Sequence, residues 1–102
     1  MNCAVYSGKI FNEPELHTSR DGTKYVTFEL VVHRPMTRDT CDYIDCFAKG
    51  EKAEFVLRNF HKGSIIEVRG VTTTRRINRD GRNEKFVELR LDEMNFGRSL
   101  PE

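Results

Sequence analysis

Hydrophobic and polar residues alternate along most of the chain, which predicts β-strands because successive side chains of a strand point to opposite faces of a sheet. The clearest segment is 24–33, where one parity, expected to face the core, holds Val26, Phe28, Leu30 and Val32. Four other segments are predicted to be strands, at residues 3–11, 41–49, 64–77 and 85–94. In the last of them we expect Val87, Leu89 and Leu91 to point inward.

One segment changes to a helical period. Residues 51–61 place Ala53, Val56, Leu57 and Phe60 at i, i+3, i+4 and i+7, which is one face of a helix, and Lys62-Gly63 supplies a typical helix end. Glycines punctuate the strands. Gly22 predicts a turn, Asp80-Gly81 predicts a type I′ hairpin, and Gly70 predicts a bend or bulge within the segment 64–77.

The order of these elements predicts an all-β fold. Five strands with one helix between the third and the fourth match the five-stranded Greek-key barrel called the OB-fold, and an SH3-like barrel is the second choice. Pro14 is expected to end regular pairing after the first strand. A chain of 102 residues makes one domain, which we place at residues 1–97, followed by a short C-terminal tail at residues 98–102.

The outward face of segment 41–49 is unusual. Tyr43, Asp45, Phe47 and Lys49 share it, a mixture too polar for a core and too aromatic for an idle surface. Phe86 lies on the outward parity of segment 85–94. Unpaired nucleic-acid bases expose π-faces that stack on aromatic side chains, so these rings beside cations favour single-stranded nucleic acid as the ligand. Burial against another subunit is the alternative for Phe86 and Phe47.

Charge is segregated along the chain. The formal net charge is only +1, yet residues 75–85 contain five cationic and two anionic side chains, a local net of 5 − 2 = +3. A basic hairpin can contact a phosphate backbone with an affinity that falls as salt rises. A solvated hairpin paired with Glu84 and Glu88 is the plainer interpretation.

The other candidate chemistries receive little support. None of the three histidines lies in a recognisable catalytic motif, so we expect no enzymatic activity. The odd set Cys3, Cys41 and Cys46 argues against a disulfide framework, and the spacing of Cys41 and Cys46 near His33 is not a usual metal pair, so we predict no metal and no cofactor. The first residues lack a secretory signal and no apolar stretch is long enough for a membrane, which predicts a cytoplasmic protein without membrane contact.

The chain resembles the bacterial single-stranded DNA-binding (SSB) family. The likeness runs from Asn2 to about Phe96 and rests on the order of its pieces: "EPEL", "DG", "VTFELVVHR", "DYIDCFAKGEKAE", "KGSIIEVRG" and "TTRR". It implies an OB-fold that forms homo-oligomers, more often tetramers than dimers, and binds single-stranded DNA in replication, recombination or transfer. RNA remains possible as a ligand. The related primosomal replication protein N, acting mainly through protein contacts, is the alternative.

The resemblance also assigns residues. Tyr43 stands where the family usually has a stacking tryptophan, while Lys49 replaces a phenylalanine and the chain contains no tryptophan. The sequence ends at "GRSLPE", without the acidic tip that recruits replication proteins in cellular members. We therefore do not expect replication proteins to bind through such a tip. A short member of this kind would suit a mobile element. The full set of predicted DNA contacts is Tyr43, Phe47, Lys49, Lys62, Arg69, Arg75, Arg76, Arg79, Arg82, Lys85 and Phe86.

Overall fold

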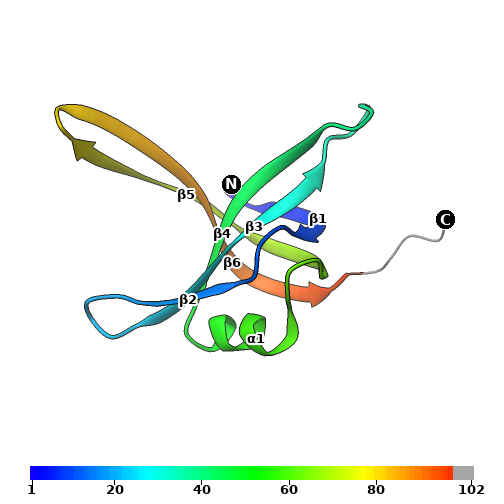
Figure 1. Cartoon of the computed structure of the whole chain (residues 1–102), viewed down its shortest axis with the longest axis horizontal. Helices are drawn as coiled ribbons and strands as arrows, with labels where there is room; N and C mark the ends of the chain where they lie inside the picture. Colours follow the sequence, from blue (N-terminus) through cyan, green and yellow to red (C-terminus); the bar gives the residue numbers. More distant parts are fainter. Residues whose placement is uncertain (98–102) are drawn as a thin grey trace.

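The structure, a computed structural model, describes residues 1–97, which form six strands and one helix (Figure 1). In chain order these elements are β1 (Ala4–Ile10), β2 (Glu15–Thr18), β3 (Lys24–His33), β4 (Cys41–Lys49), α1 (Glu51–Asn59), β5 (Ile65–Arg79) and β6 (Arg82–Phe96). The predicted tail at residues 98–102 lies outside the described residues.

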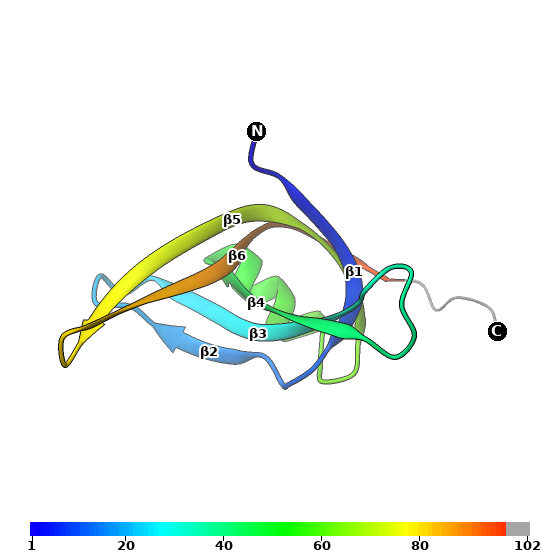
Figure 2. The ribbon, with the colours of Figure 1, turned by 90° about the horizontal axis from the view of Figure 1, so that it is seen from above.

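Five of the strands close into a ring. β1 pairs with β5, β5 with β6, β6 with β4, β4 with β3, and β3 returns to β1 through the pairs Lys9–Val31 and Ile10–Leu30. Only the short β4–β6 pairing is parallel. Figure 2, seen from above, shows the strands curving round, and Figure 1 shows α1 at one end of the ring. This connectivity is that of the OB-fold, as predicted.

The sequence prediction of five strands was incomplete, because a sixth strand follows Pro14. β1 and β2 lie one after the other along the same edge of β3: β1 pairs at Val31 and Leu30, and β2 pairs from Thr27 to Lys24. Between them the Asn12 side chain accepts a hydrogen bond of 2.8 Å from the Glu29 backbone N–H. Pro14 therefore turns the chain at a corner and does not end its pairing with β3.

The core is built from the predicted inward parity. Val26, Phe28 and Leu30 of β3 are at most 3% exposed, and the ring encloses them together with the inward residues of the other strands. α1 ends two residues before the predicted end, and its buried face closes the same core. Buried members from β4, α1 and the segment after it are Cys46, Ala48, Ala53, Val56 and Phe60.

The inward prediction for Val87 was wrong. Leu89 and Leu91 are buried, but Val87 is 51% exposed. The pairing of β6 with β4 reaches only Leu89 and Arg90, and before Leu89 the strand pairs with β5 alone. Val87 thus lies just beyond the β4–β6 pairing, where it borders an open hollow of about 230 Å³ that Tyr43 and Ile44 of β4 also line.

Gly70 and the turn at Asp80-Gly81 shape that hairpin. The register of β5 against β6 shifts between Arg69 and Gly70, and a Cβ at Gly70 would collide with the Arg90 carbonyl oxygen, so the predicted bend is confirmed. Asp80 and Gly81 have φ of 50° and 77°, as a type I′ turn requires. The bend and the turn together produce the long two-stranded arm that projects from the ring (Figure 1).

Candidate nucleic-acid interface

The outer faces of β3 and β4 form one continuous surface. Their antiparallel register places Thr27 opposite Phe47 and Val31 opposite Tyr43, so the outward parities of the two strands meet side by side. Tyr43 is 58% exposed and Phe47 is half-buried. Alternation predicted this face correctly, because the inward residues of both strands are fixed by the core.

Two hairpins flank this surface. The β2–β3 hairpin and the β5–β6 hairpin project in the same direction, to the left in Figure 1. A groove of about 620 Å³ lies between the sheet face and these hairpins. Its lining comes from the β2–β3 turn (Ser19, Arg20, Asp21, Thr23), from the strands (Tyr25, Thr27, Phe47, Lys49) and from the hairpin (Arg75, Glu88). The fold thus gathers in one groove residues that are far apart in the sequence.

Aromatic rings follow the surface from end to end. Phe11, 49% exposed, meets Tyr43 edge to face at a centroid distance of 5.1 Å. At the other end the Tyr25 ring stacks on the His17 ring at 5.0 Å, and His17 Nε2 lies 2.9 Å from the Thr27 hydroxyl. The surface therefore offers several exposed π-faces, which is the lining that unstacked bases require.

Cations lie against two of the rings. The Arg75 guanidinium is 5.0 Å from the Phe86 ring centroid, and the Lys49 ammonium is 5.8 Å from that of Phe47. Arg75 Nε also donates a hydrogen bond of 2.8 Å to Glu88. Of the predicted residues, Phe47, Lys49 and Arg75 therefore line the groove, and Phe86 lies beside it in an adjoining hollow that Arg75 also lines.

The remaining cations of the β5–β6 hairpin are divided between its two faces. Arg75 pairs across the strands with Phe86 on one face, and Arg76 lies directly opposite Lys85 on the other. Arg79 and Arg82 flank the turn as a cross-strand pair. Like charges opposite one another repel, so an anion placed between them would be stabilised. The hairpin can therefore meet phosphates on either face.

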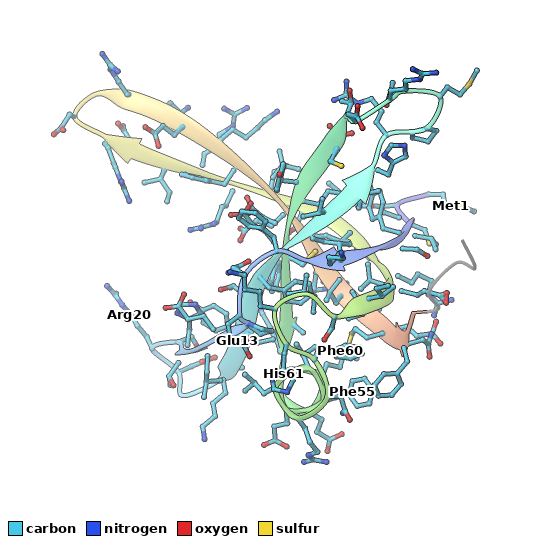
Figure 3. All side chains as sticks on the ribbon, turned by 45° about the vertical axis from the view of Figure 1, so that its right-hand side comes forward. Met1, Glu13, Arg20, Phe55, Phe60 and His61 are labelled. Atoms are coloured by element: carbon cyan, nitrogen blue, oxygen red, sulfur yellow. The ribbon has the colours of Figure 1, made fainter. Side chains whose placement is uncertain are left out.

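The β2–β3 turn is held by Asp21. Its carboxylate accepts hydrogen bonds from the Ser19 hydroxyl and from the Thr23 backbone N–H, the latter at 3.0 Å. These bonds lower the pKa of Asp21 from 3.8 to about 2. Arg20 lies at the outer end of this turn (Figure 3). The charged form of Asp21 thus shapes the wall of the groove that carries Arg20.

Two predicted contacts, Lys62 and Arg69, lie off both the groove and the projecting part of the β5–β6 hairpin. The Lys62 backbone N–H donates a hydrogen bond of 2.9 Å to Glu13, whose other carboxylate oxygen lies 2.9 Å from His61 Nδ1. These bonds lower the pKa of Glu13, and Figure 3 shows Glu13 beside His61. Arg69 lies on β5, opposite Val5 of β1, with its guanidinium 3.3 Å from Glu93. Neither Lys62 nor Arg69 lines the groove, and their DNA contacts, like those of the other listed residues, remain predictions.

Sequence reasoning missed Arg20, Phe11 and His17. Tyr25 has the outward parity of segment 24–33, but alternation alone does not show that its ring joins the groove. Arg20 precedes the Asp21-Gly22 turn, so a basic turn residue was visible. Phe11 and His17 gave no usable signal, because their position depends on β1 and β2 sharing one edge of β3.

The three cysteines do not gather. Cys3 and Cys41 are exposed near strand ends, and Cys46 is 2% exposed, with burial raising the pKa of its thiol to about 12. His33 lies directly opposite Cys41, but within residues 1–97 no three His, Cys, Asp or Glu side chains form a group that could hold a metal. In the same part of the chain, no helix has the length and apolar character to cross a membrane.

Comparison with known proteins identifies the class. Residues 1–97 match the Single-strand binding protein family, and the chain belongs to this family. It is 30% identical over 103 residues to the single-stranded DNA-binding protein of Fusobacterium nucleatum, covering 95% of this chain and 67% of that protein.

Two relatives from bacilli give the same result. The single-stranded DNA-binding protein of Halalkalibacterium halodurans and single-stranded DNA-binding protein A of Bacillus subtilis are each 30% identical over 101 residues, or 94% of this chain. The chain spans 60% and 59% of these two relatives.

Proposed function

We propose that the protein binds single-stranded DNA along the outer face of β3 and β4 without reading a defined sequence. The observation that carries the proposal is the groove between the two hairpins, where aromatic rings and cationic side chains line one continuous surface. The β-sheet face and the flanking loops are where OB-folds bind oligonucleotides. Membership of the family supports the same ligand.

The outer face of β3 and β4 and the hairpin beside it offer two kinds of contact. Tyr43, Phe47 and Phe86 offer rings for base stacking, worth about 1–3 kcal/mol per base. Arg75 and Lys49 provide charge beside two of these rings. The other predicted phosphate contacts of the hairpin are Arg76, Arg79, Arg82 and Lys85. Stacking is tolerant of sequence because every base has a π-face, so the combination suits binding and protection of exposed strands.

Titration with oligo-dT at several salt concentrations tests this proposal. We expect binding that weakens linearly on a logarithmic salt axis, because cations released from the DNA accompany each phosphate contact. A duplex of equal length should bind far more weakly, since its bases are already stacked. Equal affinity for the duplex, or no binding at low salt, would overturn the proposal. Oligo-U in parallel measures RNA binding, which the same contacts permit.

We propose that the protein acts as a homo-oligomer, and a tetramer is expected before a dimer. Support comes from β1, which pairs with β3 only at Lys9 and Ile10, so the edge of residues 4–8 facing away from β5 has no strand partner within residues 1–97. Val5 on this strand is 68% exposed. An unpaired edge is a ready surface for a second copy, and a tetramer would use a further contact.

A charge on this strand tests the assembly. Val5→Glu places an anion at the edge in every copy, and a two-fold pairing would bring two such charges together. We expect sedimentation to show a smaller species than the unmodified protein. A Val5→Thr control keeps the shape and β-propensity of the side chain and should leave the assembly intact. Equal sedimentation of the Val5→Glu protein would place the interface elsewhere.

The proposed ligand also indicates the cellular processes in which the protein would act. Single strands are exposed while DNA is replicated, recombined or transferred, and we propose a role in those processes in the cytoplasm. The role is one of binding, without a chemical step. The chain covers only part of the length of these relatives. We therefore propose no segment of it as the one that recruits other replication proteins.

A further inference from the structure

Two carboxylates lie in the middle of the proposed DNA-binding face. Asp45 is on the outward parity of β4 between Tyr43 and Phe47, about 6–7 Å along the strand from each. Glu29 of β3 lies directly opposite Asp45 in the register. Like charges facing one another across a sheet are destabilising, so their presence needs an explanation other than stability.

Neighbouring cations do not neutralise this pair. Arg75 is bonded to Glu88, and the Arg90 guanidinium lies 3.6 Å from Asp92. Within residues 1–97 neither Glu29 nor Asp45 has an ion-pair partner or a side-chain hydrogen bond. Their oxygens therefore remain available as acceptors.

The position of both groups is fixed by the fold. The Glu29 backbone donates to the Asn12 side chain at 2.8 Å and accepts a hydrogen bond of 2.9 Å from the Phe11 backbone N–H. Asp45 precedes the buried Cys46. Together they line a hollow of about 250 Å³ that also contains the Phe86 ring and Arg75. The carboxylates thus lie in one hollow with a ring on which a base can stack.

This geometry selects which part of the ligand passes over the pair. Phosphates would be repelled by two anions, so bases and not the backbone are favoured there. A carboxylate can only accept hydrogen bonds. Cytosine carries an exocyclic amino group at the ring position where thymine and uracil carry a carbonyl oxygen. Thymine and uracil donate only through the single ring N3–H, which two carbonyl oxygens flank.

We infer that Asp45 and Glu29 give the DNA-binding face a base bias, accepting hydrogen bonds from the amino groups of stacked bases and thereby favouring cytosine over thymine or uracil. The inference rests on the proposed function and deepens it: stacking sets the general affinity, and the carboxylates rank the bases. A carboxylate that only repelled DNA would lower the affinity for every base equally.

The experiment compares oligo-dC with oligo-dU of equal length, which differ at the ring position that carries an amino group or a carbonyl. Dissociation constants are measured at neutral pH for the full chain and for Asp45→Asn, Glu29→Gln and the double variant. A hydrogen bond to a charged group implies that the oligo-dC preference of the unmodified protein exceeds that of the double variant by about ten-fold or more. Glu67→Gln, the same charge change on a half-buried residue of β5 that does not line the groove, is the control.

The affinity ratio is the decisive readout, because loss of a negative charge strengthens binding of both oligonucleotides and cancels in the ratio. We expect the dC:dU ratio to fall in the Asp45→Asn and double variants and to stay constant in Glu67→Gln. An unchanged ratio in the double variant would overturn the inference and leave the proposed function standing. Failure of the unmodified protein to bind either oligonucleotide would overturn both.

Discussion

Two outer walls of the same barrel differ in chemistry more than in size. The wall of β1 and β5 carries a hollow of about 790 Å³, larger than the groove on β3 and β4 at about 620 Å³. Its lining includes Ser7, Lys9, Ile65 and Glu67 of these strands, and Val31, His33 and Cys41 from one end of β3 and β4, but no phenylalanine or tyrosine ring. It borders instead the edge of β1 at residues 4–8 that has no strand partner among residues 1–97.

The two hollows therefore differ in the groups that they offer to a ligand, and the larger volume is not the one with aromatic rings. Rings and cations suit stacked bases and phosphates, and the free backbone groups of β1 suit another strand. On this basis the β3–β4 face is the proposed DNA-binding surface and the β1 edge the proposed contact with a second copy. The predictions below test this division.

The largest effect should come from the core that both walls share. Phe60 is 1% exposed and its ring lies 5.0 Å from that of Phe96. Phe60→Ala should lower the free energy of unfolding by about 3–5 kcal/mol, because a cavity replaces a buried ring. Chemical denaturation measures the loss, and DNA binding and assembly should fail together as the protein unfolds. If DNA binding or assembly survived alone under partly denaturing conditions, the two walls would not depend on a common core.

A ring on the β3–β4 face should matter only for DNA. Tyr43→Ala should weaken binding of oligo-dT by about 1–3 kcal/mol if a base stacks there. Val5→Ala removes a comparably exposed side chain from the other wall and should leave binding per protomer unchanged. Fluorescence anisotropy at fixed salt gives both values. An equal loss of oligo-dT affinity in the two variants would contradict the proposal that only the β3–β4 face binds DNA.

Two arginines form a matched pair for the salt dependence. Arg75 and Arg69 are 58% and 55% exposed, and each is paired with a glutamate, Glu88 or Glu93. Arg75→Ala should reduce the slope of log affinity against log salt by about one, because one phosphate contact is lost. Arg69→Ala should reduce it less, since Arg69 lies off the groove. A larger change in the slope for Arg69→Ala would indicate that DNA runs over the β1–β5 wall.

The smallest effect concerns the turn beside the groove. The pKa of Asp21 is lowered in the folded state, so its contribution to stability is present above 3.8 and is lost as pH falls toward about 2. Asp21→Asn should therefore flatten the pH dependence of thermal unfolding over this range. Asp80→Asn at the other hairpin turn, where no side-chain hydrogen bond is formed within the described residues, serves as the control. Identical profiles for Asp21→Asn and the unmodified protein would contradict this role.

Local pattern determined much of the molecule. Period-two alternation placed Val26, Phe28 and Leu30 inside, and the same parity placed Tyr43 and Phe47 outside, because one face of each strand must be buried. The helical period of residues 51–61, the glycine turns and the order of elements were enough to predict the OB-fold. These features are local, since they depend on residues within a few positions of one another.

Tertiary structure decided the rest. Val87 has the inward parity but lies just beyond the β4–β6 pairing, and Phe11 and His17 join the surface because β1 and β2 share one edge of β3. The pairing of Glu29 with Asp45, the ring beneath Arg75 and the free edge of β1 likewise depend on register between distant strands. By itself the sequence determined which side chains face outward on each strand, because burial imposes a period of two. Only the closed sheet decided which of those side chains meet, because contacts across a barrel are fixed by strand pairing and not by distance along the chain.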